Sequence, residues 1–242
     1  MSAFGIIPAR YASTRFPGKV LTPIHGYPMV HHVYQRAKAC RLLDDVVIAT
    51  DAPEVARVCA TLGDRVMLTP SDHASGTDRV ADVARILEIE TDLVINIQGD
   101  EPQLDPGIVD DLVGHMEAHP QLNMGTLGST ILEEDEWADP NVVKVIARDD
   151  VTVGFYRTLP PEPPEGAVLR HIGLYAYRPA FLQTFAAAPP SVSEKEERLE
   201  QLRAVDMGET IGLVEVAYGA MAVDTPEDLK KVLANWQPFN AA

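Results

Sequence analysis

The sequence predicts an α/β fold with a β-rich lobe inserted after its first half. In the first 120 or so residues, short apolar runs alternate with segments of helical periodicity, which is typical of βαβ units. The apolar runs are nearly continuous, as expected of parallel strands covered by helices on both faces. Later strand-like runs follow one another without long helices between them. No long linker divides the 242 residues, so we expect a single α/β unit.

Helix-boundary residues support the elements of the first half. Pro28 suits the first turn of a helix, where its missing N–H is not needed. Asp51 is a candidate N-cap for the next helix, and Gly63 a candidate stop. Apolar residues recur at helical spacing from Val80 to Leu87. We therefore predict strands at 4–7, 46–49, 65–68 and 92–97, and helices at 28–40, 52–62, 77–87 and 106–118.

The second half is expected to form the β-rich lobe and to close the fold. A proline-rich loop at 159–166 interrupts its strands, and a charged helix is expected at 193–207. The remaining predicted strands lie at 124–132, 142–147, 151–156, 170–177 and 211–216, and the remaining helices at 179–187 and 225–236.

Composition and charge restrict the class of protein. With 46% hydrophobic and 23% charged residues, the chain is expected to fold rather than to be disordered or collagen-like. A net charge of −16 argues against non-specific binding to nucleic acid or to acidic membranes. No apolar run is long enough to span a bilayer, and the N-terminus reads as a first strand rather than a signal peptide. The two cysteines, Cys40 and Cys59, cannot form a disulfide framework and fit a reducing cytoplasm.

A basic loop follows the first predicted strand. Arg10, Arg15 and Lys19 lie within ten residues of one another, and residues 1–19 contain no acid. Ser13 and Thr14 add two hydroxyls. Guanidinium and ammonium groups can neutralise the oxygens of a polyphosphate, so this loop is a candidate anion site. The alternative is a surface loop with incidental charges.

Two acidic segments complete the pattern, because ligands of open α/β sheets bind beyond the carboxyl ends of the strands. Asp100 follows a buried strand and suits a hard cation such as Mg²⁺, although it could instead cap a turn. Asp224 precedes the last helix and could cap it, with Glu227 three residues further on. Together with the basic loop, the two acids favour Mg²⁺-assisted phosphoryl or nucleotidyl transfer.

Eight segments of the chain carry recognisable motifs, at 7–19, 49–51, 72–79, 96–102, 139–145, 170–178, 199–203 and 223–229. In this order they resemble one family, the 3-deoxy-manno-octulosonate (Kdo) cytidylyltransferases, also called CMP-Kdo synthetases. The resemblance implies a Rossmann-like nucleotidyltransferase fold with a mixed central sheet, and a homodimer whose β-rich lobe serves dimerisation and the acceptor. It also implies Mg²⁺-dependent transfer of CMP from CTP to Kdo, with release of pyrophosphate, for lipopolysaccharide-type sugar activation.

By the same resemblance, residues 1–120 would form the CTP-binding half, 121–210 the acceptor and dimer lobe, and 211–242 a closing strand and helix. Lys19, Asp100 and Asp224 would be catalytic, and the two aspartates would ligate the metal. Residues implied to bind CTP are Pro8, Ala9, Arg10, Ser13, Thr14, Arg15, Lys19, Ser75, Gly76, Thr77 and Gln98. Residues implied to bind the acceptor are Arg157, His171, Tyr175, Glu200 and Gln201, with Arg157 meeting its carboxylate.

The chain departs from the family beside the implied acceptor site. Gly154-Phe155-Tyr156-Arg157 stands where the family usually has Tyr-Phe-Ser-Arg, and the segment from Arg157 to Arg170 is shorter than usual. A different acidic acceptor, such as another 2-keto-sugar acid or a phosphonate, is therefore an alternative. A non-catalytic nucleotide-binding homologue is a further alternative, but Asp100 and Asp224 are both present.

Overall fold

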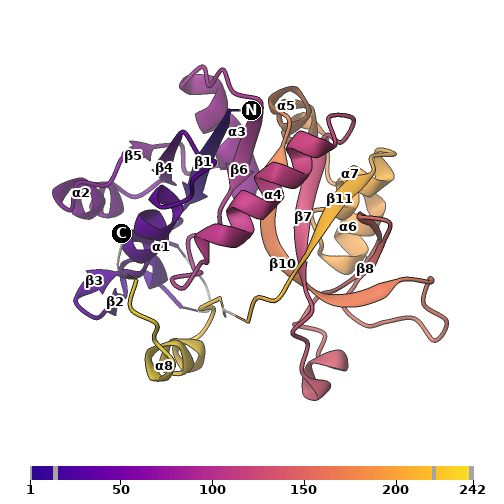
Figure 1. The fold of residues 1–242 in the computed structure, drawn as a ribbon. Helices are drawn as coiled ribbons and strands as arrows, with labels where there is room; N and C mark the ends of the chain where they lie inside the picture. Colours follow the sequence, from indigo (N-terminus) through magenta and orange to yellow (C-terminus); the bar gives the residue numbers. More distant parts are fainter. Residues whose placement is uncertain (1, 13–15, 220–221, 240–242) are drawn as a thin grey trace. The chain divides into compact units, whose positions relative to one another are not determined.

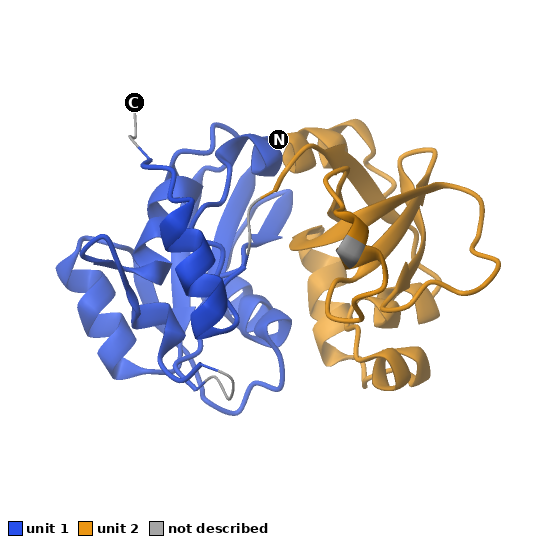
Figure 2. Cartoon of the chain, turned by 90° about the horizontal axis from the view of Figure 1, so that it is seen from below, with its two compact units in different colours: residues 1–110, 220–242 blue, residues 111–219 orange. Residues whose placement is uncertain are grey.

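The computed structural model describes residues 2–12, 16–219 and 222–239. Figure 1 gives the order of the elements along the chain. The chain separates into two compact units, shown in Figure 2. Unit 1 comprises residues 1–110 and 220–242, and unit 2 comprises residues 111–219. The division falls inside helix α4 (Pro106–Ala118).

Unit 1 contains the parallel strands that the first half of the sequence predicts. Their order is β5 (Val66–Leu68), β4 (Asp45–Thr50), β1 (Ala3–Pro8) and β6 (Leu93–Asn96). Ile6 of β1 lies opposite Val47 on one side and Asn96 on the other. The apolar side chains of β1, β4 and β6 are almost wholly buried, which explains their continuous apolar runs.

Helices and short elements complete unit 1. Helix α1 packs on β4, and α3 packs on β1. The 3-10 helix η1 and the small hairpin of β2 and β3 lie between β1 and α1 and were not predicted. The bounds are η1 (Lys19–Leu21), β2 (Pro23–Ile24), β3 (Tyr27–Pro28), α1 (Met29–Lys38), α2 (Pro53–Thr61), α3 (Gly76–Ile86) and α8 (Pro226–Ala234).

Unit 2 is built on the long strand β10 (Ala167–Tyr177). Residues 167–170 of β10 pair antiparallel with β8 (Lys144–Arg148), and residues 170–177 pair antiparallel with β7 (Met124–Ser129). β11 (Ile211–Val216) runs parallel to β7, and β9 (Val151–Tyr156) is antiparallel to both β8 and β11. The chain therefore combines parallel and antiparallel strand pairing, and the prediction of an α/β fold with a mixed sheet is confirmed. The other elements of unit 2 are η2 (Glu134–Trp137), α5 (Pro179–Ala187), α6 (Val192–Glu197) and α7 (Leu202–Asp206).

Two local predictions are wrong. The charged segment expected as one helix at 193–207 forms α6 and α7, because Arg198 takes a left-handed conformation with φ 55° that ends α6. Asp51 does not cap α2, which begins at Pro53 after Ala52. The Asp51 carboxylate instead accepts a hydrogen bond from the buried guanidinium of Arg79 at 3.0 Å.

The structure also bears on the membrane and cysteine expectations. Within the described residues, no helix has both the length and the apolar character needed to cross a membrane. Cys40 and Cys59 are free and buried, and burial raises the pKa of each thiol to about 12. Neutral thiols are poor nucleophiles, so we assign both to the core of unit 1.

Candidate active site

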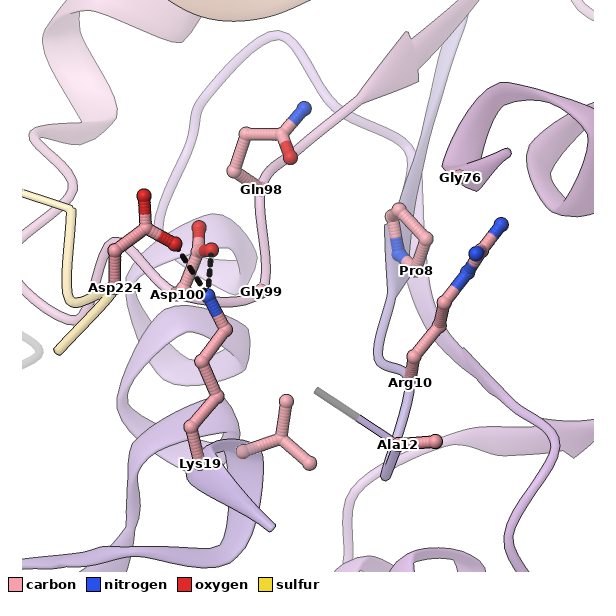
Figure 3. A pocket seen from close by; sticks show the side chains of 10 residues that line it. Pro8, Arg10, Ala12, Lys19, Gly76, Gln98, Gly99, Asp100 and Asp224 are labelled. Atoms are coloured by element: carbon pink, nitrogen blue, oxygen red, sulfur yellow. Dashed lines mark hydrogen bonds and ion pairs between the residues drawn. The ribbon is translucent and has the colours of Figure 1, made fainter. Parts of the chain in front are cut away.

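The loop that follows β6 and the segment that precedes α8 meet at the ammonium of Lys19, the first residue of η1, as Figure 3 shows. Lys19 Nζ donates to Asp100 Oδ2 at 2.6 Å and to Asp224 Oδ1 at 3.0 Å. It also donates to the Val223 carbonyl oxygen at 3.2 Å. Two carboxylates and one carbonyl thus converge on a single cation in unit 1.

Backbone and core contacts fix the acidic segments. The Val223 amide donates to the Asp100 carbonyl at 2.9 Å, which ties the segment before α8 to the loop after β6. The Val223 side chain is buried in a cluster with Ile24, Met29 and Val232. Asp224 therefore follows an anchored residue, and its carboxylate reaches Lys19 from that anchor.

The alternative role for Asp224 as a helix cap is wrong. Thr225 caps α8: its hydroxyl accepts from the Asp228 amide, and the Asp228 carboxylate accepts in return from the Thr225 amide. The cap lies one residue later than the sequence suggested. The Asp224 carboxylate is consequently left for the contact with Lys19.

Electrostatics keep Lys19 charged. Burial alone would lower its pKa, but the carboxylates of Asp100 and Asp224 outweigh burial, so the pKa of Lys19 lies above its ordinary value. The side chains of Lys19, Asp100 and Asp224 are 12%, 22% and 40% exposed. The cluster is therefore partly open to ligands rather than sealed in the core.

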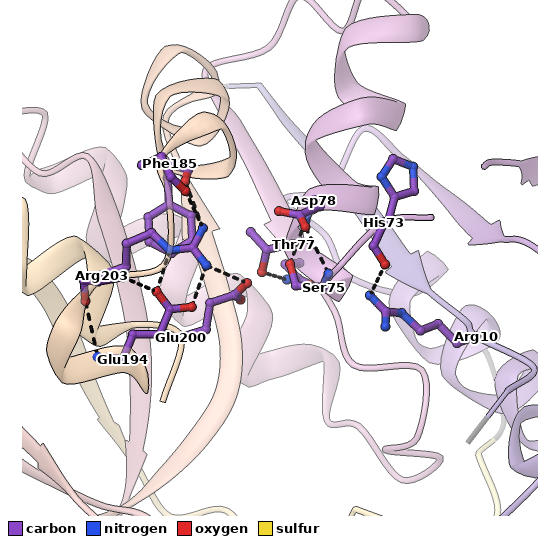
Figure 4. A network of polar contacts seen from close by, with 12 residues as sticks. Arg10, His73, Ser75, Thr77, Asp78, Phe185, Glu194, Glu200 and Arg203 are labelled. Atoms are coloured by element: carbon purple, nitrogen blue, oxygen red, sulfur yellow. Dashed lines mark hydrogen bonds and ion pairs between the residues drawn. The ribbon is translucent and has the colours of Figure 1, made fainter. Parts of the chain in front are cut away.

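A cavity of about 450 Å³ in unit 1 opens onto this cluster. Arg10 borders it, and its guanidinium donates to the His73 carbonyl at 3.1 Å, as Figure 4 shows. Gly99 is needed in this wall because a Cβ there would lie 2.9 Å from the Pro8 carbonyl oxygen. The lining residues are Pro8, Arg10, Ala12, Lys19, Val20, Gly76, Gln98, Gly99, Asp100 and Asp224.

The structure brings together several, but not all, of the residues implied to bind CTP. Pro8, Arg10, Lys19, Gly76 and Gln98 line the cavity. Sequence reasoning missed Ala12, Val20 and Gly99 as lining residues, although each neighbours a predicted one.

The other implied CTP-binding residues are chain neighbours of lining residues but do not line the cavity themselves, or they are not described. Ala9 is fully buried, and its amide donates to the Ala49 carbonyl at 2.8 Å. Thr77 is also buried, and the Ser75 hydroxyl caps α3 by accepting from the Asp78 amide. The predictions for Ser13, Thr14 and Arg15 fall outside the described residues.

A second polar cluster lies on β10 of unit 2, where a register shift between Ile172 and Tyr175 interrupts the pairing with β7. His171 Nε2 lies 3.1 Å from the Tyr175 hydroxyl and 3.2 Å from Thr126 Oγ1. Burial lowers the pKa of His171 to about 4. Burial, reinforced by the Glu200 carboxylate, raises the pKa of Tyr175 well above its usual range. Both side chains are therefore neutral at pH 7.

Arg157 and the segment between α6 and α7 lie in the same unit. Arg157 donates from Nε to the Glu197 carbonyl at 2.8 Å, and from its two terminal nitrogens to Pro140 at 3.0 Å and Arg198 at 3.1 Å. Its guanidinium thus ties the end of β9 to the left-handed turn after α6.

Glu200 and Gln201 follow that turn directly. Glu200 lies 3.7 Å from Arg203, which also pairs with Glu194 at 2.6 Å (Figure 4). Gln201 is buried, and among the described residues its Nε2 has no hydrogen-bond partner. An unpartnered buried amide is a candidate donor to a ligand.

Comparison with known proteins decides the family. A family model described as "Cytidylyltransferase" matches residues 4–211. The chain belongs to the cytidylyltransferase family. This cytidylyltransferase is 45% identical to the 3-deoxy-manno-octulosonate cytidylyltransferase of Syntrophotalea carbinolica, over 97% of this chain and 98% of the relative. The resemblance found in the sequence is confirmed.

Other relatives share nearly the whole cytidylyltransferase chain. The 8-amino-3,8-dideoxy-manno-octulosonate cytidylyltransferase of Shewanella halifaxensis is 42% identical, over 93% of this chain and 94% of the relative. A solved structure of CMP:2-keto-3-deoxy-manno-octonic acid synthetase complexed with CTP is similar, with a TM-score of 0.91, 40% identity, and coverage of 97% of this chain and 98% of that one. A thymidylyltransferase structure from Bacillus anthracis, at 17% identity and a TM-score of 0.70, shares the fold.

Proposed function

We propose that this cytidylyltransferase transfers CMP from CTP to Kdo and releases pyrophosphate. The observation that carries the proposal is the 45% identity, over nearly the full length of both chains, to a relative that bears this name. The similarity to a synthetase structure complexed with CTP supports CTP as the nucleotide.

Unit 1 supplies groups suited to CTP. The Arg10 guanidinium and the Lys19 ammonium border the same cavity and can stabilise phosphate oxygens. Arg15, Ser13 and Thr14 are proposed to add to this phosphate site. Pro8, Gly76 and Gln98 form the part of the lining proposed to enclose cytidine.

The oxygen donors around Lys19 also fit a Mg²⁺ ion. Asp100, Asp224 and the Val223 carbonyl converge on one point, which is the hard-oxygen chemistry that Mg²⁺ prefers. Among the described residues, no group of three or more His, Cys, Asp and Glu side chains forms a complete metal site. Mg²⁺ is commonly held by one or two carboxylates together with substrate phosphates. We propose that Asp100 and Asp224 hold it; when bound, it would polarise the α-phosphate.

In the proposed reaction, an acceptor hydroxyl oxygen attacks the α-phosphorus of CTP in line. The bond from the α-phosphorus to the bridging oxygen breaks, pyrophosphate leaves with that electron pair, and the hydroxyl proton passes to water. Arg10, Arg15 and Lys19 are proposed to stabilise the charge on the leaving pyrophosphate. These cations act where charge develops, so their effect is expected on turnover as well as on CTP binding.

Unit 2 supplies the groups proposed for the acceptor. The neutral pair His171 and Tyr175 and the buried amide of Gln201 offer hydrogen bonds to sugar hydroxyls. Glu200 and Arg157 would complete this set. Arg157 is proposed to pair with the carboxylate of the acceptor.

A second acceptor deserves comparison with Kdo. The Shewanella halifaxensis relative is named for 8-amino-3,8-dideoxy-manno-octulosonate, and its 42% identity lies within the 39–45% of the Kdo relatives. The altered segment Gly154–Arg157, beside the proposed acceptor residues, favours including it in any test.

We also propose a homodimer in the cytoplasm. The homodimer follows from the family resemblance, and light scattering after size exclusion would measure it. The free, buried Cys40 and Cys59 fit a reducing compartment.

A panel of acceptors tests the proposed function. Pyrophosphate release from CTP is measured with Kdo, with its 8-amino analogue, with another 2-keto-sugar acid and with no acceptor. We expect release to depend on an acceptor and to be fastest with Kdo. Faster release with the 8-amino analogue would reassign the acceptor, and release that needs no acceptor would contradict transfer.

A further inference from the structure

The ammonium of Lys19 is fully engaged. A lysine ammonium has three N–H donors, and three oxygens accept them: Asp100 Oδ2 at 2.6 Å, the Val223 carbonyl at 3.2 Å and Asp224 Oδ1 at 3.0 Å. No donor is left for a phosphate. The same side chain, however, borders the cavity proposed for CTP. Lys19 must therefore release at least one of these oxygens before it can bind a nucleotide phosphate.

The Lys19 ammonium also occupies the place that a divalent cation bound to Asp100 and Asp224 would take. A divalent cation held by Asp100 and Asp224 needs the carboxylate oxygens that now face Lys19. Two positive ions cannot share those oxygens at hydrogen-bonding distance without strong repulsion. Without any cation, two convergent carboxylates would repel each other.

We propose that Lys19 is a placeholder cation, which holds Asp100 and Asp224 in position in the nucleotide-free protein and is displaced when a divalent cation binds with the nucleotide. The proposal rests on the proposed function, which supplies the nucleotide and the metal. Nucleotide phosphates draw the ammonium away, and this movement exposes the two carboxylates to the metal. Divalent-cation binding to the free protein is then weak and is coupled to nucleotide binding.

The coupling has a thermodynamic consequence. Any ligand that draws Lys19 away raises the affinity of the carboxylates for the metal, and the metal raises the affinity for that ligand by the same factor. If the ammonium leaves the carboxylates in only a tenth of the molecules, the apparent metal affinity falls about tenfold. Removing the ammonium should restore that affinity without nucleotide.

Mn²⁺ binding to the nucleotide-free protein tests this inference. Free Mn²⁺ is measured by electron paramagnetic resonance during titration of the parent and of Lys19→Met. We expect Lys19→Met to bind Mn²⁺ about tenfold or more tightly than the parent. Adding Asp224→Asn to Lys19→Met should remove the gain.

Lys38→Met is the matched control, because Lys38 also pairs with a carboxylate, Asp45, at 2.9 Å, but lies outside the cavity lining. Its Mn²⁺ affinity should equal that of the parent. Lys19→Gln, which keeps a donor but not the charge, is the second variant, and its affinity should lie between those of the parent and Lys19→Met. Circular dichroism checks the fold of each.

Two results would overturn the inference. One is an unchanged or weaker Mn²⁺ affinity in the folded Lys19 variants. The other needs no Lys19 variant: tight Mn²⁺ binding by the nucleotide-free parent that Asp224→Asn abolishes. Acceptor-dependent turnover of the parent is measured on the same preparation. A wrong proposed function would appear in that turnover, whereas a wrong role for Lys19 would appear only in the Mn²⁺ affinities.

Discussion

The cluster around Lys19 in unit 1 and the cluster around His171 in unit 2 hold their polar groups by opposite means. Lys19, Asp100 and Asp224 are charged and partly exposed, and they pair by opposite charge. His171 and Tyr175 are half-buried and neutral, and hydrogen bonds join them. The first cluster is suited to binding phosphates and metal ions, whereas the second is suited to hydrogen bonding with the hydroxyls of a sugar.

The difference also predicts how each cluster responds to change. Replacing Lys19, Asp100 or Asp224 in unit 1 removes a charge that the proposed binding of phosphate or metal requires. Replacing a neutral group in unit 2 alters hydrogen bonding and the cost of burial. Variants in unit 1 should therefore act mainly on turnover, and variants in unit 2 on acceptor use and on stability.

The largest effect is expected from Asp100→Asn and Asp224→Asn. Each removes one anionic ligand from the proposed metal site, and metal stabilisation of a transition state is worth several kcal/mol. We expect turnover to fall by roughly a thousandfold or more, with an unchanged circular dichroism spectrum. Asp111→Asn, at an exposed position of α4, is the control and should keep the parent rate. A folded Asp224→Asn variant with near-parent turnover at saturating Mg²⁺ would remove Asp224 from the site.

Arg157→Ala should give the next largest effect, confined to the acceptor. The variant would lose the charge-assisted hydrogen bonds proposed between Arg157 and the acceptor carboxylate. This loss should raise the KM for Kdo by roughly tenfold to a hundredfold, while the KM for CTP stays the same. Arg157→Lys should recover only part of the loss, because one ammonium cannot replace a guanidinium that reaches Pro140, Glu197 and Arg198. Arg148→Ala, at an exposed position, is the control. An equal rise in both KM values would contradict the proposed division of roles between the two units.

The neutral state of His171 makes stability depend on pH. Its pKa is about 4 in the folded protein, against 6.5 for an ordinary histidine. Below pH 6.5 the unfolded chain binds a proton that the folded one does not, so this contribution to stability is present above that pH and is lost as the pH falls toward 4. From pH 7.5 to pH 5 the parent should lose about 2 kcal/mol that His171→Gln does not lose. Urea unfolding of both proteins measures this, and equal losses would show that folding does not favour the neutral form of His171.

The smallest effect concerns the cap beside the charged cluster. Thr225→Ala should lower the free energy of unfolding by about 1 kcal/mol, because Thr225 caps α8. Thr61→Ala is the control, since the exposed Thr61 hydroxyl only donates back to Arg57 within α2. Urea denaturation compares the free energies of unfolding of the two variants. Equal values would show that Thr225 does not cap α8.

The sequence predicts the elements of both units better than their local contacts. The bounds of α4, β9, α5 and β11 agree with the prediction, because proline starts and clear apolar runs define them. The break at Arg198 was missed because a positive φ at a non-glycine residue has no reliable sequence signal.

The charged site could be predicted in part because Lys19 and Asp100 come after the parallel strands β1 and β6, where such sheets collect their ligands. The choice between Asp224 and Thr225 as the cap could not, since both residue types cap helices well. The contacts of Arg157 with three carbonyls could not be predicted either, because they depend on where the turn after α6 lies.

Phosphorus NMR of one reaction distinguishes transfer of CMP from simple hydrolysis of CTP. CTP, Kdo and Mg²⁺ are incubated with the parent, and the fate of each phosphate is followed. Transfer predicts that the α-phosphate signal becomes that of a CMP diester while the β- and γ-phosphates appear together as pyrophosphate, and that neither occurs without Kdo. Conversion of CTP to free CMP or CDP at the same rate with and without Kdo would contradict CMP transfer to Kdo.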